Sequence, residues 1–337
     1  ACIDFVNDDD GPETCNTYNM LKLTEDLFRM EPKAEYADYY ERAMFNHILS
    51  TQHPEHGGYV YFTSARPRHY RVYSAPNEAM WCCVGSGMEN HSKYNQFIYT
   101  HVGKKLYVNL FVASELNWKD RGIVLRQETS FPEEESTTIR IQEGRRFFRL
   151  MVRYPGWVEA GKLTVTVNGK AKKVKAAPGS YLSIFRLWRK GDVVEIALPM
   201  RNTVEHMPNV PDYVALMHGP ILLGMKTGTE DLAGLIADDG RWGQYAGGRK
   251  LPVDQAPILV CDDVEKLGAH LVPVEGKPLH FKLDVDMINP IDAELEPFHD
   301  IHDARYMMYW LALNRDGYKT YVDSLATLEK EKLILEG

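Results

Sequence analysis

The sequence predicts an α+β multidomain protein in which helices come first and an antiparallel β-sandwich follows. Apolar residues recur at helical spacing in the first 100 residues, as in the run from Met20 to Met30. From about residue 104 the period changes to two, and tight turns such as Asn168-Gly169 separate the runs. A chain of 337 residues is long enough for two or three domains.

Three helices are predicted before residue 100. The first begins after a cap at Asn16 or Thr17 and runs to about Met30. The second covers about 34–50 and the third about 84–97. Three amphipathic helices with long loops make a poor domain on their own, so we expect their apolar faces to pack against further helices.

The β-rich part is predicted from short runs of alternating β-branched and aromatic residues. The expected strands of the sandwich are 106–112, 138–141, 148–153, 163–167, 181–187 and 193–198. Further strands are expected at 213–223, 279–285 and 304–313, with an excursion at 226–262 and a charged helical tail at 321–335. We therefore expect three units: residues 1–103, 104–225 and 226–337.

Composition narrows the classes of function. The chain is 44% hydrophobic and 26% charged, which is typical of a soluble globular protein. Its formal charge of −8 argues against nucleic acid and anionic membrane surfaces as partners, and no apolar run approaches the roughly 20 residues of a membrane span. An aromatic content of 11% suits carbohydrate, whose CH faces stack on rings, although tyrosine is also common in cores and on surfaces.

Four side chains could form one metal site: Glu13, Cys15, Cys82 and Cys83. Glu13 and Cys15 are two residues apart just before a helix, so in an extended stretch both can face one ion. Glycines at 85 and 87 allow a bend that would let two adjacent cysteines bind together. Five cysteines do not indicate a disulfide framework, and adjacent cysteines rarely bond each other.

Simpler interpretations of these residues stay open at this point. Glu13 can be a capping carboxylate and Cys15 a buried thiol, and Cys82-Cys83 can be two core cysteines at a helix start. The 67-residue separation of Cys15 and Cys82 gives no zinc-finger signature. The scattered histidines indicate no metal ligand, since a lone histidine is more often a hydrogen-bonded structural residue.

Two motifs together show a resemblance to a known family. GPETCN at residues 11–16 and WCCVGSGMENH at residues 81–91 resemble the β-L-arabinofuranosidases of glycoside hydrolase family 127 and its relative, family 146. The second motif is most similar to the branch typical of gut Bacteroidetes. IHDARYMMYW at residues 301–310 is similar to the strand that closes the β-region of this family.

The resemblance implies the C-terminal helices of an (α/α)₆ barrel followed by an antiparallel β-sandwich. It implies Zn²⁺ held by Glu13, Cys15, Cys82 and Cys83, with Cys82 as the nucleophile that forms a thioglycosyl intermediate. Tyr61 would contact the substrate or the cysteine. The expected reaction is the release of L-arabinose, with retention of configuration, from a plant-derived oligosaccharide or polysaccharide. The resemblance also favours the periplasm.

The family's general acid/base is a glutamate slightly more than a dozen residues before the Glu-x-Cys triplet. Only twelve residues precede Glu13, none is a glutamate, and Asp4, Asp8, Asp9 and Asp10 do not match the motif. We therefore expect the C-terminal part of such an enzyme, with the missing half of the barrel packing on residues 1–103. General acid help is typically worth ~10²–10⁴-fold, so the chain alone is expected to be inactive or weak.

Two other classes of function remain as alternatives. A non-catalytic carbohydrate-binding β-sandwich protein would bind sugar without the four candidate ligands. A redox or structural-zinc protein would show disulfide chemistry at Cys82-Cys83 or a zinc site closed to substrate.

Overall fold

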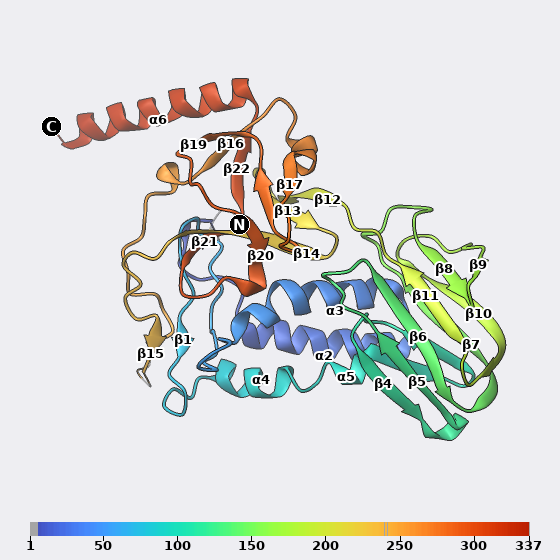
Figure 1. Ribbon diagram of the computed structural model, residues 1–337. Coiled ribbons are helices and arrows are strands. Elements are labelled where there is room, and N and C mark those ends of the chain that lie inside the picture. The colour runs from blue at the N-terminus through green and yellow to red at the C-terminus, as the bar shows by residue number, and fades with distance from the viewer. Residues whose placement is uncertain (1–5, 239, 241, 337) are drawn as a thin grey trace.

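The computed structural model describes residues 6–238, 240 and 242–336, and it has an α+β architecture. Figure 1 shows a layer of helices in the middle, a β-sandwich at one end and a third sheet on the other side of the helices. The described helices do not form a closed barrel. Cys2 and Asp4 lie outside the described residues.

The predicted first helix is α2 (Thr14–Met30), but it starts earlier than the sequence indicates. Neither Asn16 nor Thr17 is the cap; Glu13 occupies the N-cap position without a side-chain capping bond. The start is set by tertiary pairing, because the first helical amide donates to the Tyr61 carbonyl at 3.0 Å. A distant segment therefore overrides the local capping preference.

The other predicted helices are confirmed with shifted ends. The second is α3 (Ala34–Asn46), which continues into a short 3₁₀ turn at Ile48–Thr51. The third begins two residues earlier than expected and divides into α4 (Cys82–Asn90) and α5 (Asn95–Ile98).

Helix α2 has apolar residues on two faces. Leu21 and Phe28 are buried, and the Phe28 ring packs edge-on against Phe97 and Tyr107, with ring centroids 5.2 and 5.7 Å apart. The apolar run that the sequence singles out faces solvent instead. Its exposed members are Met20, Leu23, Leu27 and Met30.

Two sheets form the predicted sandwich. The four-stranded sheet has the order β10 (Ser180–Arg189), β7 (Arg145–Tyr154), β3 (Lys105–Val108), β2 (Tyr99–Val102). The six-stranded sheet has the order β4 (Ser114–Trp118), β5 (Ile123–Glu128), β6 (Ser136–Glu143), β11 (Val193–Ala197), β8 (Thr164–Val167), β9 (Lys170–Lys172). Most pairs are antiparallel, but β3 runs parallel to β7 because the chain crosses to the other sheet between them.

The third sheet contains ten strands and lies on the far side of the helices (Figure 1). Its long hairpin is β13 (Val210–His218) and β14 (Ile221–Gly228), with β12 (Asn202–Met207) beside β13. The later strands are β16 (Ile258–Val260), β17 (Leu271–Pro273), β18 (Phe281–Leu283), β19 (Asp286–Ile288), β20 (Leu295–Pro297), β21 (Arg305–Met307) and β22 (Trp310–Leu313). The predicted boundary between residues 225 and 226 therefore falls inside β14 and cuts through this sheet.

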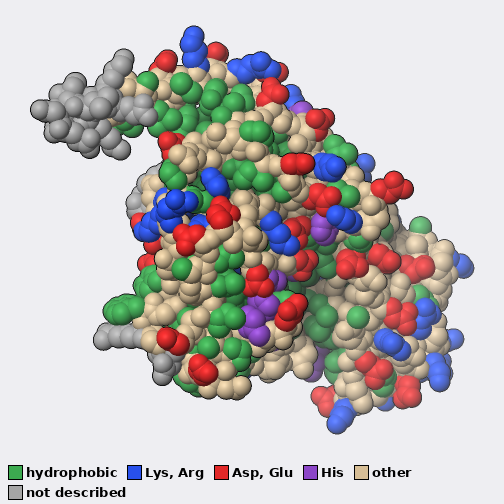
Figure 2. Space-filling model, turned by 60° about the vertical axis from the view of Figure 1, so that its left-hand side comes forward, with side chains coloured by type: hydrophobic (Ala, Val, Ile, Leu, Met, Phe, Trp, Pro, Cys, Tyr) green, Lys and Arg blue, Asp and Glu red, His purple; other side chains and the backbone are tan. Residues whose placement is uncertain are grey.

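The charged tail forms a helix, α6 (Arg315–Glu336), which projects from the third sheet in Figure 1. None of the described helices is long and apolar enough to cross a membrane. Figure 2 shows Lys and Arg side chains interspersed with Asp and Glu on the face it presents, without a broad basic patch among the coloured side chains.

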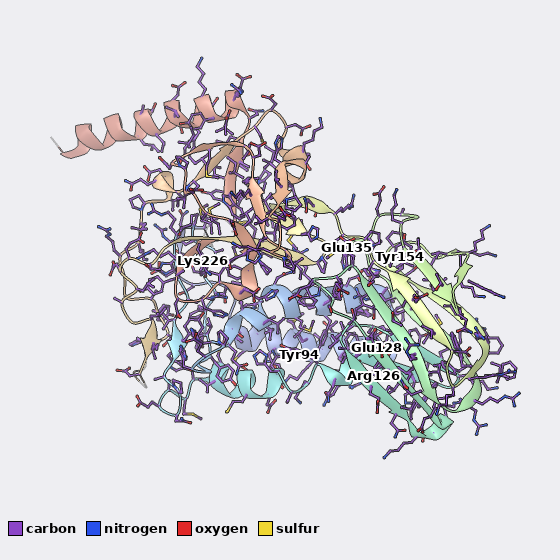
Figure 3. All side chains as sticks on the ribbon, viewed as in Figure 1. Tyr94, Arg126, Glu128, Glu135, Tyr154 and Lys226 are labelled. Atoms are coloured by element: carbon purple, nitrogen blue, oxygen red, sulfur yellow. The ribbon has the colours of Figure 1, made fainter. Side chains whose placement is uncertain are left out.

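A buried ion-pair network joins the helices to the sandwich. Arg153 on β7 is 0% exposed and pairs with Asp38 at 2.5 Å and with Glu41, both on α3. Its Nε donates to the Asn109 carbonyl at 2.6 Å, and Trp157 Nε1 donates to Glu41 at 2.8 Å. Every charge in the network therefore has a partner, as burial requires. Figure 3 shows the same region with Tyr154, at the end of β7, labelled.

The predicted excursion is anchored back onto the helical part of the chain. Its short strand β15 (Ile236–Ala237) pairs in parallel with β1 (Tyr73–Ser74). Arg305 is fully buried and donates hydrogen bonds to four backbone carbonyls, one in the loop before β1 and three in the excursion. These acceptors belong to Arg68, Glu230, Asp231 and Arg249, at 2.8, 2.9, 2.9 and 3.1 Å.

Candidate metal and nucleophile site

Two helix N-termini bring the four predicted ligands together. Glu13 caps α2 and Cys15 lies in its first turn, while Cys82 and Cys83 are the first two residues of α4. Their ligand atoms all lie within 4.8 Å of one another. The structure therefore brings together the four residues that the sequence grouped, although Cys15 lies inside the helix and not in an extended stretch before it.

The glycines near the cysteine pair have a different role from the predicted one. They lie inside α4, so no bend separates Cys82 from Cys83. A Cβ at Gly87 would lie 2.3 Å from the Tyr59 ring, which means that glycine is needed for the close approach of this tyrosine. A Cβ at Gly85 would meet nothing within 4 Å.

The spacing of the ligand atoms fits a tetrahedral zinc ion. Zn–S bonds of about 2.3 Å in a tetrahedron separate two sulfurs by about 3.8 Å. The Cys82 and Cys83 sulfurs are 4.0 Å apart, and a Glu13 carboxylate oxygen lies 3.7 and 3.9 Å from them. These residues therefore form a group that could hold a metal ion, and their number and types are compatible with zinc.

The three thiols differ in their access to solvent. Cys83 is 0% exposed and Cys15 is half-buried, whereas Cys82 is exposed. An electrophile arriving from solvent therefore meets the Cys82 sulfur. A separation of 4.0 Å also leaves Cys82 and Cys83 as free thiols, and both are unpaired in the structure.

Tyr61, which the resemblance places near the substrate or the cysteine, is an aromatic neighbour of Cys82 in the structure. Its hydrogen bond with Cys82 is the main cause of a raised tyrosine pKa, and burial and the charge of Cys82 act in the same direction. The phenol therefore keeps its proton at neutral pH. It can donate that proton in a hydrogen bond to the sulfur, which stabilises a thiolate.

Contacts that the sequence did not indicate join α2 to α4 beside the site. The Ser86 hydroxyl lies 3.2 Å from the Cys15 sulfur, and the Tyr18 hydroxyl donates to the Glu89 carboxylate. Trp81, immediately before Cys82, packs against residues of the excursion. No periodic pattern or ligand-type signal marks such residues in a sequence. The potential metal cluster found in the described part of the chain consists of Glu13, Cys15, Cys82 and Cys83.

Metal binding at this site should release protons. Burial raises the pKa of both Cys15 and Cys83, and neighbouring cysteines raise the pKa of Cys83 further. Both thiols are therefore protonated in the metal-free chain at neutral pH, and a bound metal requires thiolates.

We expect zinc to displace about two protons or more and to bind more weakly as pH falls from 8 to 6. Calorimetric titrations in buffers of different ionisation enthalpy would count the protons. Zinc binding without proton release at neutral pH would contradict thiolate ligation.

Comparison with known proteins identifies the family. Residues 4–96 match the model of the β-L-arabinofuranosidase GH127 catalytic domain, and residues 105–200 match that of the GH127 middle domain. These two models together match more than half of the chain. The chain belongs to glycoside hydrolase family 127. Residues 203–312 of this GH127 protein match a domain of unknown function.

Individual relatives agree with this assignment. A non-reducing end β-L-arabinofuranosidase of Bifidobacterium longum is 26% identical over 243 residues, which is 65% of this chain and 36% of the relative. A solved GH127 β-arabinofuranosidase shares the fold with a TM-score of 0.68 and 22% identity, covering 89% of this chain and 49% of its own.

The GH127 β-L-arabinofuranosidase of Geobacillus stearothermophilus T6 gives a TM-score of 0.64 at 20% identity, covering 91% of this chain and 51% of its own. The GH127 chain described here thus spans about half the length of these solved structures and about a third of the curated relative.

Proposed function

We propose that this chain carries the nucleophile and the zinc ligands of a retaining β-L-arabinofuranosidase. The observation that carries the proposal is the exposed Cys82 sulfur in a cluster whose other thiols are half-buried or buried. Four protein ligands would fill a tetrahedral zinc ion, as they do in structural sites. The case for catalysis therefore rests on the solvent access of one ligand, Cys82, and the alternative of a structural-zinc or redox protein predicts that this thiol does not react with the sugar.

Glu13, Cys15, Cys82 and Cys83 would hold the zinc, which supplies the deprotonated thiolate at neutral pH. The Cys82 sulfur attacks the anomeric carbon of the arabinofuranoside, and the bond from this carbon to the leaving oxygen breaks. Water then attacks the same carbon, its proton passes to solvent and the C–S bond breaks, which restores the thiolate. Two inversions give net retention of configuration. Tyr61 would orient the sulfur by donating a hydrogen bond to it.

The proton for the leaving oxygen has no clear donor among the described residues before Glu13. Asp9 is paired with Lys250 at 2.7 Å. Burial and the charges of Asp8 and Asp9 raise the pKa of Asp10. A raised pKa favours the protonated form that a proton donor needs. Asp10 does not, however, match the family motif. We propose an arabinofuranoside-containing plant glycan as the natural substrate class, and we expect activated arabinosides, whose leaving group needs no proton, to react with this chain.

A nitrophenyl β-L-arabinofuranoside tests the proposal, because nitrophenolate leaves without a proton. We expect about one zinc per chain by elemental analysis, together with nitrophenolate release and one pentosyl group on Cys82 by peptide mass spectrometry. A folded, reduced, zinc-loaded chain that neither releases nitrophenolate nor becomes labelled would refute the nucleophile. Sugar binding that survives loss of all four ligands would favour the non-catalytic carbohydrate-binding alternative.

A further inference from the structure

A row of aromatic rings leads from the Cys82 sulfur to the protein surface. Tyr61, whose ring lies 6.2 Å from that of Trp81, the residue before Cys82, lies 4.4 Å from Phe62 between ring centroids. Phe62 lies 5.4 Å from Tyr245, and Tyr245 lies 6.2 Å from Trp242. Trp242 is 65% exposed. The row therefore begins at the proposed nucleophile and ends in solvent.

The outer two rings belong to the excursion that extends from the third sheet. Tyr245 and Trp242 come from a segment that returns to the helical part of the chain through the β1–β15 pairing. Tyr70 also fixes this segment, because its hydroxyl donates to the Ala233 carbonyl at 2.5 Å and accepts from the Gly248 amide at 2.7 Å. Two distant parts of the chain are thus locked together beside Cys82.

The same segment packs directly against the residue before the nucleophile. Trp81 lies against a small apolar cluster that contains Tyr70, Val72 and Ala237. The Trp81 ring is also 6.2 Å from Tyr61. The excursion is therefore part of the wall around Cys82, and its rings are held at a defined place relative to the sulfur.

We propose that Phe62, Tyr245 and Trp242 form a binding subsite for the sugar to which the arabinose is attached. Neighbouring rings lie 5.4 and 6.2 Å apart and are tilted by 40° and 43° to each other, so they offer ring faces at successive angles. The CH faces of a sugar ring stack on such surfaces. This inference rests on the proposed function, since it extends the same site from the arabinose to the leaving-group side.

Calorimetry with two ligands tests the subsite. The ligands are L-arabinose and a disaccharide with a terminal β-L-arabinofuranosyl unit, and the proteins are the wild-type chain, Trp242→Ala and Tyr245→Ala. We expect each substitution to weaken disaccharide binding about three- to tenfold and to leave arabinose binding unchanged.

The matched control is Phe185→Ala, which removes a similarly exposed ring (55%) from β10 in the sandwich and should alter neither affinity. Unchanged disaccharide affinity in both variants, or a parallel loss for both ligands, would overturn the subsite. Failure of the wild-type chain to bind the disaccharide would overturn it as well.

Labelling of Cys82 by the nitrophenyl arabinoside, measured in the same variants, separates this inference from the proposed function. If every variant is labelled and its disaccharide affinity is unchanged, the subsite is refuted and the proposed nucleophile is supported. If the variants lose disaccharide affinity selectively but no protein is labelled, the aromatic residues bind sugar and the proposed glycosidase activity is refuted.

Discussion

Cys82→Ser is expected to lower the rate of arabinosyl transfer from the nitrophenyl arabinofuranoside by at least about 10³-fold. A serine hydroxyl keeps its proton at neutral pH and is a weak nucleophile without an adjacent base. The substitution also removes one of the four proposed zinc ligands, so we expect weaker zinc binding. Nitrophenolate release and the mass of the intact protein would measure both steps of the reaction.

Cys261→Ser is the matched control for this change. Cys261 is also a free cysteine, but it is buried beside the third sheet and lies outside the metal cluster. This variant should react with the arabinoside and bind zinc as the wild-type chain does. A pentosyl group that still forms on the Cys82→Ser variant would show that another residue is the nucleophile.

Arg153→Ala is expected to lower the free energy of unfolding by about 3–5 kcal/mol. The substitution leaves Glu41 fully buried without its cation and frees Asp38 from its ion pair. Urea unfolding followed by circular dichroism would measure the loss. Arg149→Ala is the control, because Arg149 lies on the same strand but is only half-buried and binds Ser183, so we expect a change within about 0.5 kcal/mol.

The pH dependence of the same variant gives a second measurement. Burial raises the pKa of Glu41, and Arg153 opposes that effect. Without Arg153 the folded state should bind a proton at Glu41 more tightly than the unfolded state does. The free energy of unfolding should therefore fall as pH rises past the pKa that Glu41 has in the unfolded state. The loss caused by Arg153→Ala should therefore be smaller at pH 5 than at pH 8. An equal loss at both values would show that the unpaired carboxylate is not the cause.

Local signals in the sequence predicted most elements of the fold correctly. The Asn168-Gly169 turn between β8 and β9 is an example, since both residues adopt positive φ angles of 52° and 71°. Helix boundaries were predicted less well. The start of α2 depends on a backbone bond to Tyr61, which capping preferences cannot indicate.

The site could be predicted as a group of residues but not as a geometry. Glu13 and Cys82 were identified by their motifs, whereas the order of exposure among the thiols follows from the packing of two helix N-termini. No pattern in the sequence indicated which contacts anchor residues 226–262 to the helical part of the chain. The partners of Arg305 are backbone carbonyls, and any residue type can provide a carbonyl.

The Arg305 contacts also set an order of events during synthesis. Domains tend to fold from the N-terminus as the chain leaves the ribosome. The loop that carries Tyr61 continues to Arg68, whose carbonyl receives its hydrogen bond from a residue made more than 200 positions later. The aromatic wall around Cys82 can therefore reach its final form only after the third sheet has emerged. The surroundings of Cys82 thus depend on segments at both ends of this sequence, which makes the site sensitive to truncation after residue 300.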